Sequence, residues 1–228
     1  MRLVGILGGM GPEATVLLMQ KVIDRRAGGD DAGHVPLLVH QNPQVPSRIA
    51  ALIEGTGESP APVLADMARA LEGAGARALA MPCNTAHAYA GDIRAAAGVP
   101  FLDMIALSTG RLAGQGDRIG MLASPAVRLA GVFDDAFAAA GLTAVWPEDD
   151  SPVLALIRAV KAGRTGAEEA AALADLARDL TGRGADHLAI ACTELSLLAP
   201  RLPDGLDWTD TLDCLADAIV AFSAAADD

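Results

Sequence analysis

The sequence predicts an α/β fold built from two similar α/β/α units, each with a parallel sheet. Short apolar runs bounded by glycine alternate with alanine-rich stretches at helical spacing, a pattern typical of parallel α/β proteins. The 228 residues, 52% of them hydrophobic and 20% charged, are enough for a buried core. An internal echo between the two halves of the chain predicts two units.

The apolar runs predict strands at residues 2–7, 37–40, 78–81, 99–103, 118–122, 144–146 and 187–191. The alanine- and leucine-rich stretches predict helices at residues 12–26, 60–73, 86–97, 126–140, 167–183 and 210–225. The first strand should end in the turn Gly8-Gly9-Met10-Gly11-Pro12, which opens the first helix. No stretch approaches the roughly 18 consecutive apolar residues of a membrane helix, so we expect no membrane association.

The echo consists of two paired segments. The strand LVGIL ends in a glycine turn and a helix, and in the second half RIGML ends in Ala123-Ser124-Pro125 and a helix. Later in each half, a long helix and Gly-Ala precede a strand that ends at a cysteine, in GARALAMPCNT and GADHLAIACTE. Any α/β protein repeats strand, turn and helix, so chance similarity is the alternative, but it explains the matched Cys-Thr endings poorly.

Two such units should pack about a pseudo-twofold axis. Ligands of parallel α/β sheets bind beyond the carboxyl ends of the strands, so facing units would aim Cys83 and Cys192 into one shared cleft. We expect a first unit of residues 1–104 plus 210–228 and a second unit of residues 105–209. The chain should cross between them near residues 105–116, and its last helix should return to the first unit.

Charge and cysteine content limit the function. The formal charge of −12, from 17 basic and 29 acidic residues, argues against nucleic acid and an anionic membrane as partners. An acidic ligand would therefore need local positive charge in its site. Three cysteines, an odd number, do not form a disulfide framework, and we predict a cytoplasmic protein.

Cys83 and Cys192 each lie where a predicted strand becomes a helix. There the helix dipole and free backbone N–H groups should lower the pKa of a thiol. Buried inert cysteine is the alternative for each, and Cys214, within the apolar pattern LDCLADAIV, fits that description. His87 should cap or pack under the helix after Cys83.

Two thiols at facing positions suit racemisation of an amino acid. One thiolate removes the Cα proton, and the opposite thiol returns a proton to the other face. The enolate-like intermediate needs hydrogen-bond donors, which backbone N–H groups and the side chains of Asn84, Thr85 and Thr193 can supply. Glu194 either orients or deprotonates its neighbours, or it is a simple acid in the first turn of a helix.

At these residues the sequence resembles the aspartate/glutamate racemase family, in its aspartate-racemase-like branch. The shared segments are GILGGMGPEAT (5–15), NPQVPSR (42–48), MPCNTAH (81–87), VKAG (160–163) and CTEL (192–195). The resemblance implies two α/β units, an active site between them, catalytic Cys83 and Cys192, and neither pyridoxal phosphate nor metal. It also implies a homodimer acting on a small amino acid.

The resemblance further implies a substrate-binding set. Arg48 and Lys161 match positions that hold a distal carboxylate. Without the resemblance, they are a solvated loop arginine and a lysine at a helix C-terminus. The rest of the expected set is Met10, Ser47, Asn84, Thr85, Thr193 and Glu194. Met10 and Glu194 stand where the glutamate-racemase branch has Asp and His, which argues against strict glutamate specificity. Ala191 replaces the family's usual glycine.

Rival interpretations are weaker but stay open. The glycine turn after the first strand lacks the G-x-G-x-x-G spacing of a dinucleotide site. His34, His40 and His187 show no metal-ligand spacing with the cysteines, and neither Lys21 nor Lys161 accompanies a phosphate loop for pyridoxal phosphate. A cysteine-dependent isomerase or decarboxylase of a small diacid and a non-catalytic amino-acid-binding protein remain alternatives.

Overall fold

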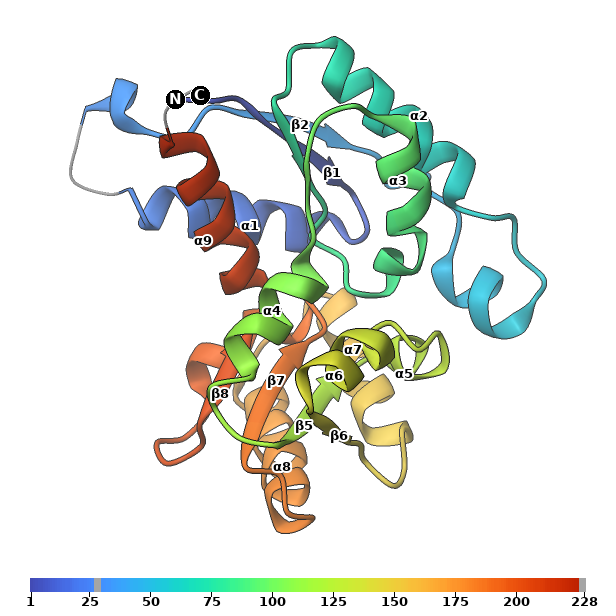
Figure 1. Cartoon of the computed structure of the whole chain (residues 1–228). Coiled ribbons are helices and arrows are strands. Elements are labelled where there is room, and N and C mark those ends of the chain that lie inside the picture. The colour runs from blue at the N-terminus through green and yellow to red at the C-terminus, as the bar shows by residue number, and fades with distance from the viewer. Residues whose placement is uncertain (27–29, 226–228) are drawn as a thin grey trace.

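The computed structural model describes residues 1–26 and 30–225, and it contains two four-stranded parallel sheets (Figure 1). The first sheet has the order β2-β1-β3-β4, from β1 (Val4–Gly8), β2 (Leu37–Gln41), β3 (Ala78–Ala80) and β4 (Phe101–Leu102). The second has the order β6-β5-β7-β8, from β5 (Arg118–Ala123), β6 (Thr143–Val145), β7 (His187–Ala191) and β8 (Trp208–Asp210). The two sheets repeat the same strand order, as the internal echo predicts.

Helices cover both faces of each sheet. The helices before the second sheet are α1 (Pro12–Asp24), α2 (Ala61–Gly73), α3 (Ala90–Ala96) and α4 (Met104–Leu112). Those after β5 are α5 (Pro125–Leu129), α6 (Asp134–Ala140), α7 (Ser151–Lys161), α8 (Ala167–Gly182) and α9 (Thr211–Ala224). No described helix is long and apolar enough to cross a membrane.

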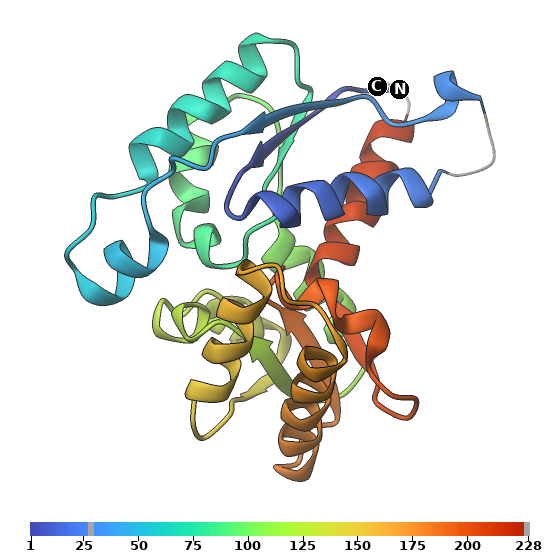
Figure 2. The same cartoon turned by 180° about the vertical axis from the view of Figure 1, so that it is seen from behind.

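The core consists of four layers of buried hydrophobic side chains, two for each sheet. In the first unit, α2 and α3 pack on one face of the sheet, and α1 and α9 pack on the other (Figure 2). In the second unit, α7 and α8 cover one face, and α4, α5 and α6 cover the other. The prediction of two α/β/α units is therefore confirmed. The central strands β1 and β7 are buried along their whole length, as expected for parallel strands covered on both faces.

Two predicted helices differ from the structure, and three elements of the structure were not predicted. The helix expected at residues 126–140 is two helices, because Gly131 takes a left-handed conformation (φ 60°) that ends α5. The helix expected at 86–97 begins with the 3-10 turn Thr85–Tyr89 before α3. Strand β8, helix α7 and the π-helical turn Ala50–Glu54 were not predicted.

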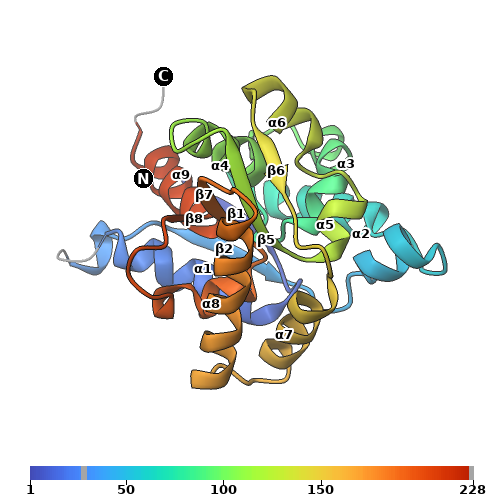
Figure 3. The ribbon, with the colours of Figure 1, turned by 90° about the horizontal axis from the view of Figure 1, so that it is seen from below.

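The crossing segment is a helix rather than an extended connection. In α4, Met104 packs into the core beside α1 and α9, whereas Ile105 and Leu112 pack into the core of the second unit. Figures 1 and 3 both show α4 beside α9 at the junction of the two units. Because α4 belongs to both cores, it holds the units in a fixed relation.

The last helix returns to the first sheet. Leu212, Leu215 and Ile219 of α9 pack against Val4 of β1 and Leu18 of α1. On this ground we propose that the first unit comprises residues 1–104 together with α9, as the sequence predicts. Residues 226–228, which the predicted first unit also includes, lie outside the described residues.

Candidate active site

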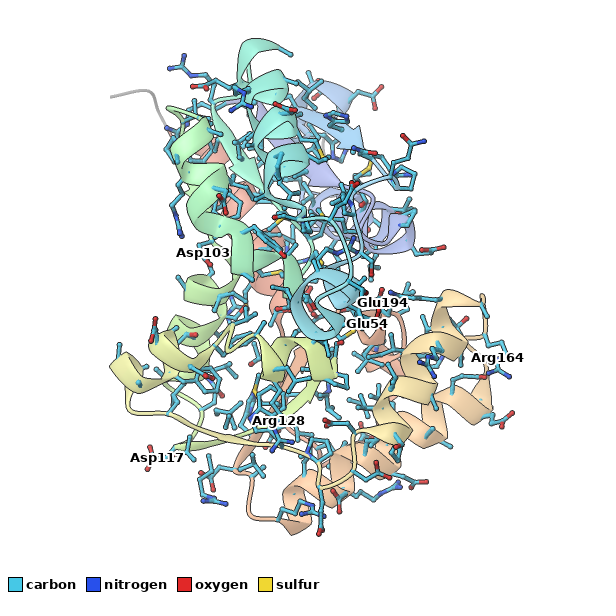
Figure 4. The ribbon with its side chains drawn as sticks, turned by 90° about the vertical axis from the view of Figure 1, so that its right-hand side faces the viewer. Glu54, Asp103, Asp117, Arg128, Arg164 and Glu194 are labelled. Carbon is cyan, nitrogen blue, oxygen red and sulfur yellow. The ribbon has the colours of Figure 1, made fainter. Side chains whose placement is uncertain are left out.

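A cavity of about 90 Å³ lies between the two units, beyond the carboxyl ends of both sheets. Loops after β1, β2, β3, β5 and β7 contribute to it, together with α7. It is lined by Met10, Ser47, Arg48, Ile49, Cys83, Thr85, Ser124, Leu154, Ile157, Lys161, Cys192 and Glu194. Figure 4 shows the labelled Glu194 at the waist between the upper and lower units. Of the predicted site residues, only Asn84 and Thr193 lie outside the lining.

The turn that carries Cys83 is held by a buried histidine. His87 lies one helical turn after Cys83, and its Nδ1 is 2.8 Å from the Cys83 carbonyl oxygen. The Met104 backbone N–H donates to Nε2 at 3.2 Å, so Nδ1 carries the proton and donates to the carbonyl. Burial lowers the pKa of His87, which keeps the ring neutral. His87 therefore packs beneath the Cys83 turn, as expected, and ties it to α4.

Cys192 has a carboxylate as its immediate partner. Its Sγ donates to Glu194 Oε2 at 3.1 Å, and the other carboxylate oxygen, Oε1, lies 3.3 Å from Lys161 Nζ. Cys192 and Glu194 follow β7, whereas Lys161 is the last residue of α7. The Glu194 carboxylate thus lies between a thiol and an ammonium group at the wall of the cavity.

The expectation that both cysteines have lowered pKa values is wrong. Burial raises the pKa of the Cys83 thiol, although the nearby Arg48 guanidinium lowers it in part. Burial raises the pKa of Cys192 well above its usual range, and the Glu194 carboxylate raises it further. The turn after each cysteine is a short 3-10 segment rather than a long helix, so little dipole field offsets desolvation.

The two predicted cations differ in their surroundings. The Arg48 guanidinium donates through Nη1 to the carbonyls of Val45 at 3.3 Å and Pro46 at 3.0 Å, within its own loop. Among the residues that the structure describes, no carboxylate forms an ion pair with Arg48, whereas Glu194 pairs with Lys161. Arg48 therefore supplies uncompensated positive charge in a protein that is anionic overall.

Asn84 and Thr193 are buried beside the cavity. The Asn84 amide nitrogen donates to Thr211 Oγ1 at 3.1 Å. Its Oδ1 is buried, and within the described part of the chain it has no hydrogen-bond partner. Thr193 is 3% exposed. Thr85, the other polar residue of the predicted cradle, does line the cavity.

Four lining residues were not predicted from the sequence: Ile49, Ser124, Leu154 and Ile157. Ser124 follows β5 as the glycine turn follows β1, so the internal echo contained the signal for it. Leu154 and Ile157 lie on α7 with Lys161, at intervals of three and four residues, which is the spacing of one helix face. A predicted helix at α7 would have placed them beside the lysine.

The fold and the cavity define a two-unit α/β enzyme with one cysteine from each unit at a shared site. Residues 7–219 match the sequence profile of the Asp/Glu/Hydantoin racemase family, and the chain belongs to this family. The protein is accordingly a racemase, within the isomerases. The predicted resemblance to aspartate/glutamate racemases is confirmed.

Similar proteins support the same assignment. The chain is 25% identical over 224 residues to the broad specificity amino-acid racemase RacX of Bacillus subtilis (strain 168), covering 96% of this chain and 97% of that protein. It is similar in structure to an aspartate racemase of Picrophilus torridus, with a TM-score of 0.83, 26% identity, and coverage of 98% and 94% of the two chains. An aspartate racemase homologue of Pyrococcus horikoshii OT3, at 21% identity and 99% and 100% coverage, shares the fold with a TM-score of 0.79.

Proposed function

We propose that this racemase acts on acidic amino acids, with aspartate as the leading candidate substrate. We also propose that Cys83 and Cys192 are its two acid–base groups. The observation that carries the proposal is that two cysteines from corresponding strand ends line one small cavity. The same cavity holds two cations that suit an acidic substrate: Arg48, which has no ion pair among the described residues, and Lys161, which pairs with Glu194. No cofactor is part of the proposed mechanism.

The reaction needs one thiolate and one thiol. The thiolate takes the Cα proton, and the electron pair left behind delocalises into the α-carboxylate as an enolate-like dianion. The thiol on the other face then donates its proton to Cα, so the products are the opposite enantiomer and a reversed pair of cysteines. Proton transfers between the cysteines and solvent restore the starting state.

The resting protonation of the two cysteines follows from their neighbours. Burial and the Glu194 carboxylate, which accepts a hydrogen bond from Cys192 Sγ, both oppose ionisation of the Cys192 thiol. Cys83 lies near the Arg48 guanidinium, which favours its thiolate. Of the two thiols, Cys83 therefore loses its proton more readily, and in our proposal it acts as the base for the enantiomer whose Cα hydrogen faces it, with Cys192 as the acid.

Substrate contacts can be assigned on the same basis. Arg48 and Lys161 hold the side-chain carboxylate, and Thr85 with backbone N–H groups of the cysteine turns stabilises the α-carboxylate. Met10 and Ser47 border this space in the cavity wall. We assign the orientation of the substrate's amino group to Glu194, which lines the cavity, together with the buried Asn84 and Thr193 next to the two cysteines.

We also propose that the enzyme works as a homodimer in the cytoplasm. Cys83, Cys192 and Cys214 are all free in the structure, and a reducing compartment preserves the two thiols that the mechanism needs. Analytical ultracentrifugation of the full chain tests the dimer.

Single-cysteine variants test the mechanism. Cys83→Ala and Cys192→Ala should each abolish racemisation of aspartate, because each lacks the acid–base group on one face. Each should still exchange the α-hydrogen of one enantiomer in deuterated buffer, and the two variants should prefer opposite enantiomers. NMR of L- and D-aspartate follows the exchange. Cys214→Ala is the control, because Cys214 is buried in α9 and outside the cavity.

Each alternative has its own outcome. Normal racemisation by either single-cysteine variant would exclude the two-base mechanism. Exchange of the same enantiomer by both variants would contradict the assignment of opposite faces. If the parent enzyme turned over no amino acid, the diacid isomerase and the amino-acid-binding protein would replace the proposal.

A further inference from the structure

The N-terminus of α9 connects the two cysteine turns through one side chain. Asn84, the residue after Cys83, donates from Nδ2 to Thr211 Oγ1 at 3.1 Å. The Thr211 hydroxyl donates in turn to the carbonyl of Ile190 at 3.1 Å. Ile190 lies on β7, two residues before Cys192. The Cys83 turn of the first unit is thereby joined to the Cys192 strand of the second.

The direction of this hydrogen-bond chain is fixed by the groups themselves. An amide NH₂ only donates and a backbone carbonyl only accepts, so the Thr211 hydroxyl must accept from one and donate to the other. Thr211 is completely buried and Asn84 is 3% exposed, so water does not compete for these bonds. Valine matches threonine in shape but can make neither bond, whereas serine can make both.

The neighbouring residue fixes the other side of the Cys192 turn. Asp210 caps α9 and accepts from the Ser196 hydroxyl at 2.8 Å. The Ser196 backbone N–H donates to the Cys192 carbonyl at 3.3 Å. Asp210 also pairs with Ile190 in the β7–β8 register. The start of α9 therefore meets the chain both before and after Cys192, and Thr211 is its link to the Cys83 turn.

We infer that Thr211 is a positioning residue for racemisation, which sets the Cys83 turn against the Cys192 strand. The inference rests on the proposed two-cysteine function. Thr211 lies outside the cavity lining and acts through Asn84 and Ile190. Two-base chemistry requires both sulfurs to reach one Cα at the same time, and a misplacement of about 1 Å can lower a rate by about 10²-fold.

A change in this spacing has a specific kinetic signature. Once a thiolate has removed the Cα proton, the intermediate either receives a proton from the opposite thiol, which inverts it, or takes one back from the first. In deuterated buffer, the first thiol can exchange its proton for deuterium before it reprotonates the intermediate, and this leaves deuterium in the starting enantiomer. Inversion leaves deuterium in the product enantiomer. The ratio of these two deuterium contents reports the spacing. A loss of folded enzyme lowers both rates equally and leaves the ratio unchanged.

The experiment compares the parent with Thr211→Val, Thr211→Ser and Thr209→Val, using L- and D-aspartate in deuterated buffer. Thr209 is a matched control on the adjoining strand, because its hydroxyl makes one buried contact, 2.9 Å from His187 Nε2, and none to the cysteine turns.

For Thr211→Val we expect kcat to fall about 10- to 100-fold and the ratio to rise for both enantiomers. Thr211→Ser should recover both to within about 3-fold of the parent, because its hydroxyl restores the bonds. Thr209→Val should keep the parent's ratio.

Results opposite to these would overturn either the positioning role of Thr211 or the proposed function, and the two cases can be told apart. An unchanged ratio in Thr211→Val, or an equal rise in Thr209→Val, would overturn the positioning role and leave the proposed function intact. A parent that racemises no amino acid, or single-cysteine variants that racemise normally, would instead overturn the proposed function. If Thr211→Val fails to fold, Thr211→Ala removes the same two bonds with less crowding and is judged by the same ratio.

Discussion

At the residue scale, Glu194 adds to the effect of burial on the acidity of Cys192. Burial raises the pKa of Cys192, and the Glu194 carboxylate, which accepts a hydrogen bond from the thiol at 3.1 Å, raises it further. In Glu194→Gln that charge is lost, and Lys161, which Glu194 now neutralises, is left to favour the thiolate. The pKa of Cys192 should therefore fall. Iodoacetamide labelling of Cys192, followed by mass spectrometry across pH, should show the alkylation profile moving to lower pH, and a move to higher pH would contradict this.

Arg48 should act on substrate affinity and on Cys83 together. A charge-assisted contact with a carboxylate is worth about 1.5–3 kcal/mol, so Arg48→Ala should raise the KM for aspartate about 10- to 100-fold. Because Arg48 lowers the pKa of Cys83, its removal should also move the rise of kcat/KM to higher pH. Steady-state kinetics at several pH values measures both effects. Arg178→Ala, on an exposed surface pair with Asp175, serves as the control. Unchanged kinetics in Arg48→Ala would remove Arg48 from the site.

At the element scale, the glycine turn between β1 and α1 brings Met10 to the cavity. Gly9 has φ 97°, and a Cβ there would lie 2.4 Å from the backbone carbonyl carbon of Asn42, the residue after β2. Gly9→Ala should therefore lower the free energy of unfolding by about 3 kcal/mol or more, from strain and clash together. Urea denaturation measures this. Gly110→Ala, in α4 with open space around it, should instead stabilise by about 0.5–1 kcal/mol. Equal effects of the two changes would refute this view of the turn.

The limits of sequence-based prediction also lie at this scale. The strongly apolar strands and the long helices α1, α2, α8 and α9 were predicted with ends near the observed ones, because burial on both faces leaves a clear pattern. The strand β8 has only three residues, Trp208–Asp210, and owes its conformation to pairing with β7. Gly131 was placed inside a continuous predicted helix, whereas its left-handed backbone ends α5.

The candidate site also has features that the sequence marks and features that depend on the folded structure. Cys83, Cys192, Arg48 and Lys161 were predicted because strand ends and family motifs mark them. The raised thiol pKa values were not, because desolvation depends on how closely the two units enclose the cavity. Thr211 was also missed as a link between the cysteine turns, since it is 128 residues from Cys83 in the sequence.

At the scale of the whole molecule, Asp210 joins the second sheet to the first unit. It ends β8, caps α9 and lies 3.4 Å from Lys21 of α1. The carboxyl group is fully buried, and one of its oxygens, Oδ2, has no hydrogen-bond partner within the described residues. Burial raises the pKa of Asp210 to about 6, in spite of Lys21. The junction of the two units therefore contains a carboxyl group that is easier to ionise in the unfolded chain than in the folded one.

The sign of the resulting pH dependence is fixed by linkage. The folded state binds the Asp210 proton more tightly, so this group stabilises the fold fully below pH 3.8, its ordinary pKa. That contribution is lost as the pH rises through about 6. A rise of roughly two pKa units corresponds to about 3 kcal/mol at most.

Asp210→Asn keeps an acceptor for Ser196 and Leu212 but cannot ionise. The variant should therefore gain stability relative to the parent, by up to about 3 kcal/mol, between about pH 4 and pH 7. Urea denaturation of both proteins across that range measures the difference, and a constant difference, or one that shrinks as the pH rises, would show that Asp210 does not take up its proton in the folded state.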